Sequence, residues 1–177
     1  LESVCIPNTV ELIDGWAFSN CYSLRNLSFQ MGSTTKMIVG KYAFQAISTR
    51  DLVLPASMMV VADCAFIRTS LQNLSFEEGS KLYSLGDQVF QASALENVVL
   101  PDGLTIIGNG NFYGCTNLVS VTFGEGLSTM GIETFKDSNV QYVHLSASLQ
   151  TLATDTFSGC SNLVEVTFAP FSQMTVI

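Results

Sequence analysis

Two stretches of the chain are nearly identical: FYGCTNLVSVTF at residues 112–123 and FSGCSNLVEVTF at residues 157–168. A more divergent copy, FSNCYSLRNLSF, occupies residues 18–29. Each copy has a Phe, a Cys three residues later, a Leu three residues after the Cys, and a tail typical of a β-strand. Because Cys is the only residue of catalytic type that recurs in a motif, two interpretations arise: a thiol site, or a structural repeat.

A period of 22 to 26 residues extends from these copies along the whole chain. Its markers are Phe18, Phe44, Phe66, Phe90, Phe112, Phe135 and Phe157. Each unit opens at Leu1, Leu24, Thr49, Leu71, Leu95, Leu118, Val140 or Leu163, which gives seven full units and a shortened eighth. One such unit cannot bury its apolar face alone, so we expect the units to stack into a solenoid.

Within a unit, two segments have different patterns. The first, as in LENVVL (95–100), alternates inward and outward side chains and predicts a β-strand. The second follows V-x-x-I-x-x-x-A-F, which suits a short helical turn, a 3₁₀ segment or an irregular extended piece. The strands would then form one parallel sheet on one face of the stack. Longer units carry extra residues after the first strand, at 29–40 and 76–86, where Gly-Ser pairs indicate loops.

The frame L-x-x-V-x-I-P-x-x-V-x-x-I-x-x-x-A-F-x-x-C, clearest at residues 1–23 and 95–117, resembles the BspA-type leucine-rich repeat of bacterial and protist surface proteins. The resemblance covers the whole chain. It implies a leucine-rich-repeat solenoid of the α/β horseshoe class, rich in β-structure, with about 7.5 repeats of 22–25 residues. We expect residues 1–177 to form a single domain that is part of a longer array. The sequence departs from the frame at Thr49, keeps the frame's Pro only at 7, 55 and 101, and has the frame's Cys in three units.

Composition excludes some classes of partner. The net charge is −8 and no basic cluster is present, which argues against nucleic acid. No stretch reaches the ~18 consecutive apolar residues of a membrane span, so we expect no membrane insertion. Residues 1–81 hold six bases and seven acids, whereas residues 82–177 hold one base and eight acids. This asymmetry is either drift between repeats or a sign that the two ends meet different partners.

The recurring Cys residues are interpreted as structural. Cys21, Cys115 and Cys160 share one repeat position, and the closest two are two units apart, about 10 Å at the ~4.8 Å spacing of paired strands. A disulfide needs Cα atoms within about 7 Å, so we expect free thiols packed in the core. Cys5 and Cys64 occupy other positions and are also expected to be free, with Cys5 facing outward and easiest to oxidise.

No constellation for catalysis, metal or cofactor is recognised in the sequence. His144 is the only His; we expect it to face outward while Cys160 of the same unit faces inward, which separates the two. A zinc site needs about four ligands. Glu77 and Glu78 are interpreted as a solvated turn, and GNGNF (108–112) as a repeat turn. We therefore expect neither enzymatic activity nor a cofactor.

The outward side chains of the first strands form the candidate interaction surface. One row has Ser3, Asn26, Asp51, Asn73, Asn97, Ser120, Tyr142 and Glu165, and the next has Cys5, Ser28, Val53, Ser75, Val99, Thr122, His144 and Thr167. Most are small and neutral, which fits either a ladder that binds nothing or a flat recognition surface. For the second interpretation we expect Tyr142 and His144 to bind a partner, with Gln141 and Glu165 beside them. Asn26 and Asn73 begin N-x-S sequons that would matter only in a eukaryotic secreted protein.

These observations favour a non-enzymatic protein-binding or adhesion module. The resemblance implies a secreted or cell-surface protein with a host or matrix protein as partner. The alternative is a passive structural spacer that displays another domain. Neither terminus carries a polar cap, so we also expect end-on self-association of the chain.

Overall fold

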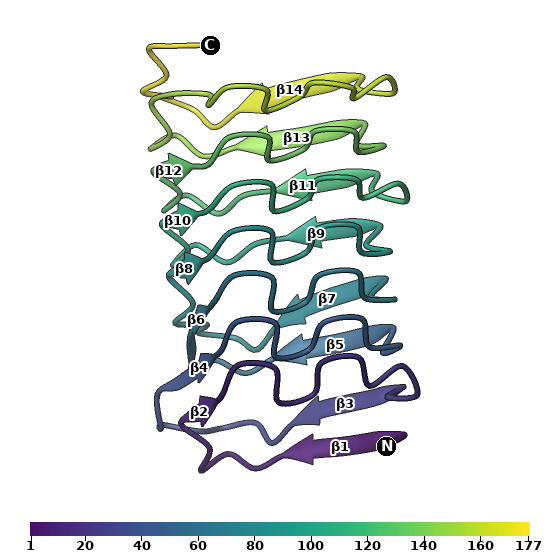
Figure 1. Ribbon diagram of the computed structural model, residues 1–177. Helices are drawn as coiled ribbons and strands as arrows, with labels where there is room; N and C mark the ends of the chain where they lie inside the picture. Colours follow the sequence, from purple (N-terminus) through teal and green to yellow (C-terminus); the bar gives the residue numbers. More distant parts are fainter.

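The computed structural model describes residues 1–177 as a stack of coils, with the termini at opposite ends (Figure 1). Each coil runs through a first strand, then a shorter second strand, then a turn segment that contains the marker Phe. The expected solenoid is confirmed. The chain has no helices, so no helical segment is available to cross a membrane.

The first strands form a parallel row along one side of the stack (Figure 1). They are β1 (Ser3–Ile6), β3 (Asn26–Phe29), β5 (Asp51–Leu54), β7 (Asn73–Phe76), β9 (Asn97–Val99), β11 (Ser120–Thr122), β13 (Tyr142–Leu145) and β14 (Glu165–Phe168). The predicted alternation is confirmed: in β3 and β5, for example, exposed and buried residues alternate strictly. Equivalent positions face each other in register, as in Tyr142 opposite Glu165.

The second segments form a parallel row of their own. They are β2 (Leu12–Ile13), β4 (Met37–Val39), β6 (Met58–Val61), β8 (Ser84–Leu85), β10 (Ile106–Ile107) and β12 (Thr129–Met130). These strands make one six-stranded sheet in the order β12-β10-β8-β6-β4-β2. Of the expected second segment, the V-x-x-I half is therefore extended, whereas the half that contains A-F forms turns.

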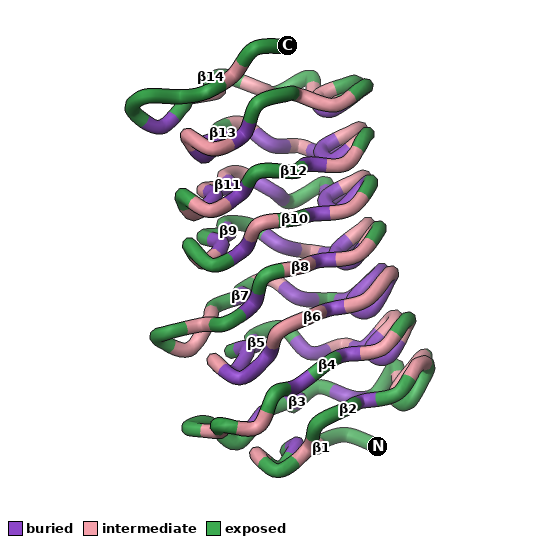
Figure 2. Tube along the Cα trace, turned by 90° about the vertical axis from the view of Figure 1, so that its left-hand side faces the viewer, coloured by how far each residue is buried: buried purple, intermediate pink, exposed green.

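The core lies between the rows and the turn segments, where the coils bury their Leu, Val, Ile and Phe side chains (Figure 2). The marker Phe rings form a continuous stack. Neighbouring ring centroids are 5.2 to 6.0 Å apart, and the planes of each pair are within 15° of parallel. Offset stacking at this distance adds to the free energy gained from burial of the rings. The period of Phe in the sequence is therefore the repeat of one aromatic ladder.

The turn segments make a third hydrogen-bonded seam, which sequence reasoning missed. The amides of Tyr42, Phe44 and Ala46 donate to carbonyls of the next coil at 3.1, 2.8 and 3.0 Å. The residues two before and two after each marker Phe have positive φ, as in Tyr42 (56°) and Ala46 (56°). Left-handed backbone disfavours β-branched side chains, and none occupies these positions. The absence of β-branched residues at these positions was the sequence signal that could have indicated the turn seam.

The first row is not the single sheet that we expected. It divides into a two-stranded sheet, β1-β3, and a six-stranded sheet that begins at β5. The break follows the longest unit, in which Phe18 and Phe44 are 26 residues apart. Because the second row continues unbroken from β2 through β4 to β6, the coils separate only on the first-row side.

A similar opening follows the other long loop. β7 and β9 pair at one position only, Asn73 with Asn97, and a cavity of about 580 Å³ lies beyond it. The expected solvated Glu pair fits only Glu78, which is exposed. The Glu77 carboxylate accepts hydrogen bonds from the amides of Gly32 at 2.9 Å and Ala56 at 2.8 Å. Glu77 therefore ties together three loops of consecutive coils.

Candidate functional site

The structure brings together three of the four residues expected to bind a partner. Tyr142 and His144 lie on β13, and Glu165 lies opposite Tyr142 on β14. All three line a shallow hollow of about 80 Å³, whose other side includes Ser120 and Thr122 of β11. Tyr142 is 45% exposed. A phenol, an imidazole and a carboxylate therefore line one hollow on a face whose other outward side chains are mostly small and uncharged.

His144 and Gln141 are held in different ways. The Nδ1 atom of His144 is 2.8 Å from the Thr167 hydroxyl, which fixes the ring against β14. Gln141 precedes β13 and is not among the residues that line the hollow. Its backbone carbonyl accepts hydrogen bonds from the amides of Val164 at 2.9 Å and Glu165 at 3.0 Å. We therefore assign Gln141 a structural contact between coils in addition to its predicted role.

Outward polar side chains of this face also bond to each other across neighbouring strands. The side-chain amide of Asn73 donates to the Asp51 carboxylate at 2.6 Å, and the Ser120 hydroxyl donates to the side-chain oxygen of Asn97 at 2.7 Å. Cross-strand pairs of this kind stabilise a sheet. The Asn of one sequon, Asn73, is thus engaged within the protein.

The thiols of the opening motif are structural, as expected, and all five Cys are free. Cys115 is fully buried; its Sγ donates to the Phe90 carbonyl at 3.2 Å and is 3.5 Å from the Ser93 hydroxyl. Burial raises the pKa of the Cys115 thiol, and it does the same at half-buried Cys160. Raised pKa values disfavour the reactive thiolate. Cys5 is exposed, as expected.

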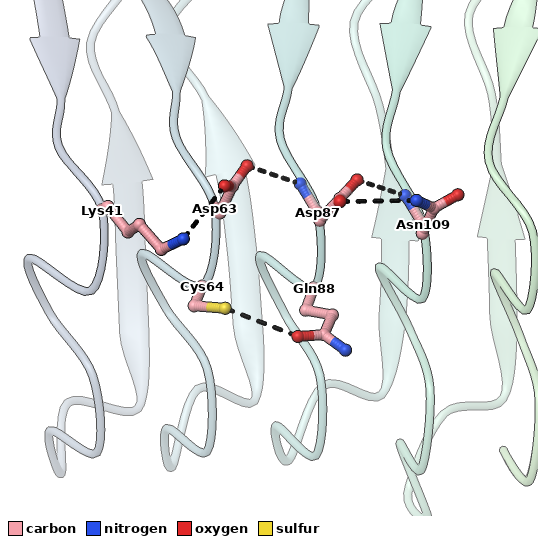
Figure 3. Close-up of polar contacts among 6 residues, drawn as sticks. All are labelled: Lys41, Asp63, Cys64, Asp87, Gln88 and Asn109. Carbon is pink, nitrogen blue, oxygen red and sulfur yellow. Dashed lines mark hydrogen bonds and ion pairs between the residues drawn. The ribbon is translucent and has the colours of Figure 1, made fainter.

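A second polar row runs along the end of the second strands and was not foreseen (Figure 3). The Asp63 carboxylate accepts from the Asp87 amide at 3.0 Å, and the Asp87 carboxylate accepts from the Asn109 amide at 2.8 Å. Lys41 pairs with Asp63 at 3.4 Å. The signal in the sequence was a small residue followed by Asp or Asn at 62–63, 86–87 and 108–109. Because each carboxylate binds an amide of the next coil, this row joins coils.

No group of three His, Cys, Asp or Glu side chains in the chain is arranged to hold a metal ion. The two largest cavities lie at the openings of the first row, about 860 Å³ between β3 and β5 and about 580 Å³ between β7 and β9. Both sit on the same side of the stack as the hollow at Tyr142. This side therefore carries three of the four cavities of the chain.

A model of the BspA type leucine rich repeat region, in six copies, matches residues 1–93 and 83–177, which together cover the chain. The chain belongs to the BspA-type leucine-rich repeat family. In these repeats, the marker Phe supplies the aromatic stack, and the opening Leu lies two residues before the first strand. No curated protein matches the sequence.

Solved structures share this repeat fold. The pneumococcal vaccine antigen PcpA superimposes with a TM-score of 0.69 at 20% identity, over 94% of this chain and 50% of PcpA. A leucine-rich repeat protein of T. pallidum gives 0.60 at 24% identity, over 94% of this chain and 69% of that one. One from Bacteroides ovatus gives 0.51 at 22%, over 99% and 62%. The chain thus spans half the length of PcpA, and these likenesses concern the fold.

Proposed function

We propose that this BspA-type chain is a non-enzymatic protein-binding and adhesion module of a secreted or surface-attached protein. The observation that carries the proposal is the convergence of Tyr142, His144 and Glu165 on one hollow of a flat, rigid strand face. Tyr is enriched among the residues that dominate binding energy at interfaces. Repeat stacks commonly bind partners through such extended faces.

The chemistry of the candidate residues supports binding over catalysis. The one His contacts a threonine hydroxyl, Thr167, but no third side chain is hydrogen-bonded to its ring to orient it as a general base. The buried thiol of Cys115 bonds to a backbone carbonyl, and its pKa is raised by burial. Neither group is therefore arranged as a catalytic nucleophile with its base.

A place on the cell surface is supported by the kind of protein that shares the fold. PcpA is described as a vaccine antigen, and the family comprises repeat regions of the BspA type. The expected partner is a host or matrix protein. This part of the proposal is an analogy of fold and family, and the binding face has to be tested on this chain.

The alternative function is a passive spacer, which is favoured by a specific observation. Most outward residues of the first row are small, and pairs such as Asn73 with Asp51 and Ser120 with Asn97 satisfy each other across strands. A face whose polar groups are already bonded offers less to a partner. A spacer would present the same stiff stack without any residue-specific binding.

A capture experiment separates the two functions. The chain is immobilised and exposed to extracellular-matrix and host cell-surface proteins, and the affinity of each captured protein is measured. Under the proposal, Tyr142→Ala and His144→Ala each weaken capture, by roughly tenfold for a central contact. The matched control is Val99→Ala, which removes an outward side chain on β9 away from the hollow. Capture that all three variants leave unchanged would exclude the hollow, and no saturable capture would favour the spacer.

A further inference from the structure

The break between β3 and β5 leaves backbone groups without the pairing that they have at other coil boundaries. After the first boundary, the amides of Arg25 and Asn26 both donate to the Glu2 carbonyl, at 3.0 and 3.1 Å. The carbonyls of Arg50, Glu96, Val119 and Gln141 accept two amides of the next coil in the same way. Across the break, the amides of Arg50 and Asp51 make no such bond to the Arg25 carbonyl. Two donors therefore face an opening.

Hydroxyl groups secure the coils just before the break. The buried Thr49 hydroxyl donates to the Leu24 carbonyl at 3.1 Å, and the Ser48 hydroxyl donates to the Tyr22 carbonyl at 2.6 Å. Thr49 replaces the opening Leu of the repeat, and its hydrogen bond to Leu24 explains why a hydroxyl residue is accommodated at this buried position. These two bonds therefore join the coils directly beside the opening.

The opening is a polar cleft of about 860 Å³, here called the β3–β5 cleft. Leu27 is the one hydrophobic residue among the eight that line it. Its lining includes the charged residues Arg25, Arg50 and Asp51 and the hydroxyl residues Ser28 and Ser70. A cleft of this size, dominated by polar groups, suits a small polar part of a larger partner.

The charged residues of the cleft favour an anionic ligand. Arg25 and Arg50 occupy the same position in adjacent coils, and neither makes an ion pair or a side-chain hydrogen bond within the protein. Lys41 and Lys136, by contrast, are each paired with acids. Two like charges at one opening repel each other, and a bound anion relieves that repulsion. In a chain of net charge −8, two unpaired guanidinium groups at one opening are a local exception.

We propose that the β3–β5 cleft binds the carboxylate side chain of an acidic segment from a protein partner. Arg25 and Arg50 would hold the carboxylate from two sides by charge-assisted hydrogen bonds, with the free amides of Arg50 and Asp51 as further donors. Two Arg and one Asp give the cleft a charge of +1, which one carboxylate balances. Asp51 would repel a doubly charged phosphate more strongly than a carboxylate. The inference rests on the proposed protein-binding function and names the chemistry of the partner.

The break itself is tested first in the free protein. Backbone amide hydrogen exchange is measured for Arg50 and Asp51 and for the equivalent Gln72 and Asn73 one coil later, whose amides bond to the Arg50 carbonyl at 2.8 and 3.0 Å. We expect the first pair to exchange at least tenfold faster, since exchange requires opening of the hydrogen bond. Equal protection of both pairs would overturn the proposal.

Binding is tested with the peptide acetyl-Gly-Ser-Glu-Ser-Gly-amide, titrated into the isotopically labelled chain and followed by amide chemical shifts. We expect saturable shifts at Arg50 and Asp51, no saturation with the Gln counterpart of the peptide, and at least fivefold weaker binding by the double variant Arg25→Gln/Arg50→Gln. Arg68→Gln, which removes an exposed Arg outside the cleft, is the matched control and should bind normally. Unchanged binding by the double variant, or equal binding of the Gln peptide, would overturn the proposal.

Two further arms identify the source of the anion and separate this inference from the proposed function. Inorganic phosphate or sulfate that binds the cleft more tightly than the Glu peptide would exclude the carboxylate. If partner capture fails but the Glu peptide binds through Arg25 and Arg50, the cleft stands and the adhesion function falls. If a partner is captured equally well by Arg25→Gln/Arg50→Gln, the cleft proposal falls alone.

Discussion

The carboxylate of Asp87 accepts a hydrogen bond from the backbone amide of Asn109, one coil further along the stack, at 2.8 Å. Asn109 repeats the arrangement, since its side-chain oxygen accepts from the Ile132 amide at 3.0 Å. Asp63 does the same for Asp87 at 3.0 Å. A short acceptor at this repeat position therefore joins each of these coils to the next, and an amide serves as well as a carboxylate.

Replacement of Asp87 should show that the acceptor matters and its charge does not. We expect Asp87→Ala to lower the free energy of unfolding by about 1 kcal/mol, the usual net worth of one hydrogen bond. Asp87→Asn should retain most of the stability, because Asn109 performs the same task with an amide oxygen. Urea unfolding followed by circular dichroism measures both. An equal loss in the two variants would mean that charge is the stabilising feature.

The sequence predicted the Phe-marked repeat, the alternating first strands and the free thiols, because each depends on side-chain pattern and spacing along the chain. It did not predict the Asp87 row or the divided first row. Both depend on how neighbouring coils approach each other, which is decided by backbone geometry. The break after β3 required a comparison of loop lengths: the unit from Phe18 to Phe44 is longer than the others by at least two residues.

Gly108 should tolerate no side chain, because the previous coil passes directly over it. A Cβ atom there would lie 2.6 Å from the carbonyl carbon of Gly86 and 2.7 Å from the amide nitrogen of Asp87. Both are backbone atoms in the stack and cannot turn aside. We expect Gly108→Ala to destabilise the chain by about 1–3 kcal/mol, as overpacking does. Gly103→Ala is the control, since its nearest neighbours are at ordinary distances of 3.4 and 3.5 Å.

Thermal unfolding of the two glycine variants provides the measurement. A lower Tm for Gly108→Ala than for Gly103→Ala supports the close approach of the coils. Similar Tm values for both variants would mean that the coils can separate at this point without cost.

Ala92 illustrates the left-handed residues that flank each marker Phe. Its φ is 53°, which costs a residue with a Cβ atom about 1–2 kcal/mol. We expect Ala92→Gly to leave stability unchanged or raise it by up to about 1 kcal/mol, because the relief of strain is offset by the greater chain entropy of Gly. Ala92→Val should destabilise, since a branched Cβ crowds this conformation further. The denaturant midpoints of the two variants provide the measurement. Equal midpoints for Ala92→Val and Ala92→Gly would contradict the prediction.

Predictability of the candidate site was uneven. Tyr142, His144 and Glu165 could be grouped because parallel pairing in register places equal repeat positions side by side. The β3–β5 cleft could not, since Arg25 and Arg50 draw attention only once the missing pairing between their coils is known. A rule based on repeat position assumes that every boundary is alike, and this boundary is the exception.

The stability of the chain should fall in alkaline solution through its inward-facing thiols. Burial raises the pKa of Cys115, and likewise that of Cys160, in the folded chain. The folded state then keeps a proton that the unfolded state releases, so the stability is fully present below the unfolded thiol pKa of about 8.5 and is lost as the pH rises through the folded value. We expect a falling urea midpoint above about pH 8.5. The double variant Cys115→Ser/Cys160→Ser should have a smaller slope there.

Cys5→Ser is the control for the removal of a thiol, because Cys5 is exposed on β1. It should retain the alkaline slope of the parent chain. A slope that is identical in the parent and in the double variant would assign the pH dependence to other groups.

The two ends of the stack should make the 177-residue chain associate end to end. β1 and β14 each pair on one side only, so both present an unpaired strand edge. Beside these edges, Leu1 is 63% exposed and Phe171 is 97% exposed. Because the two ends differ, head-to-tail contact would give open chains of copies, and their mass should rise with concentration.

Light scattering of Leu1→Lys/Phe171→Lys should show a smaller rise in mass with concentration than the parent chain. Val99→Lys places the same charge at a 67% exposed site on β9, away from the ends, and should associate like the parent. A parent chain that stays monomeric at millimolar concentration would contradict the prediction.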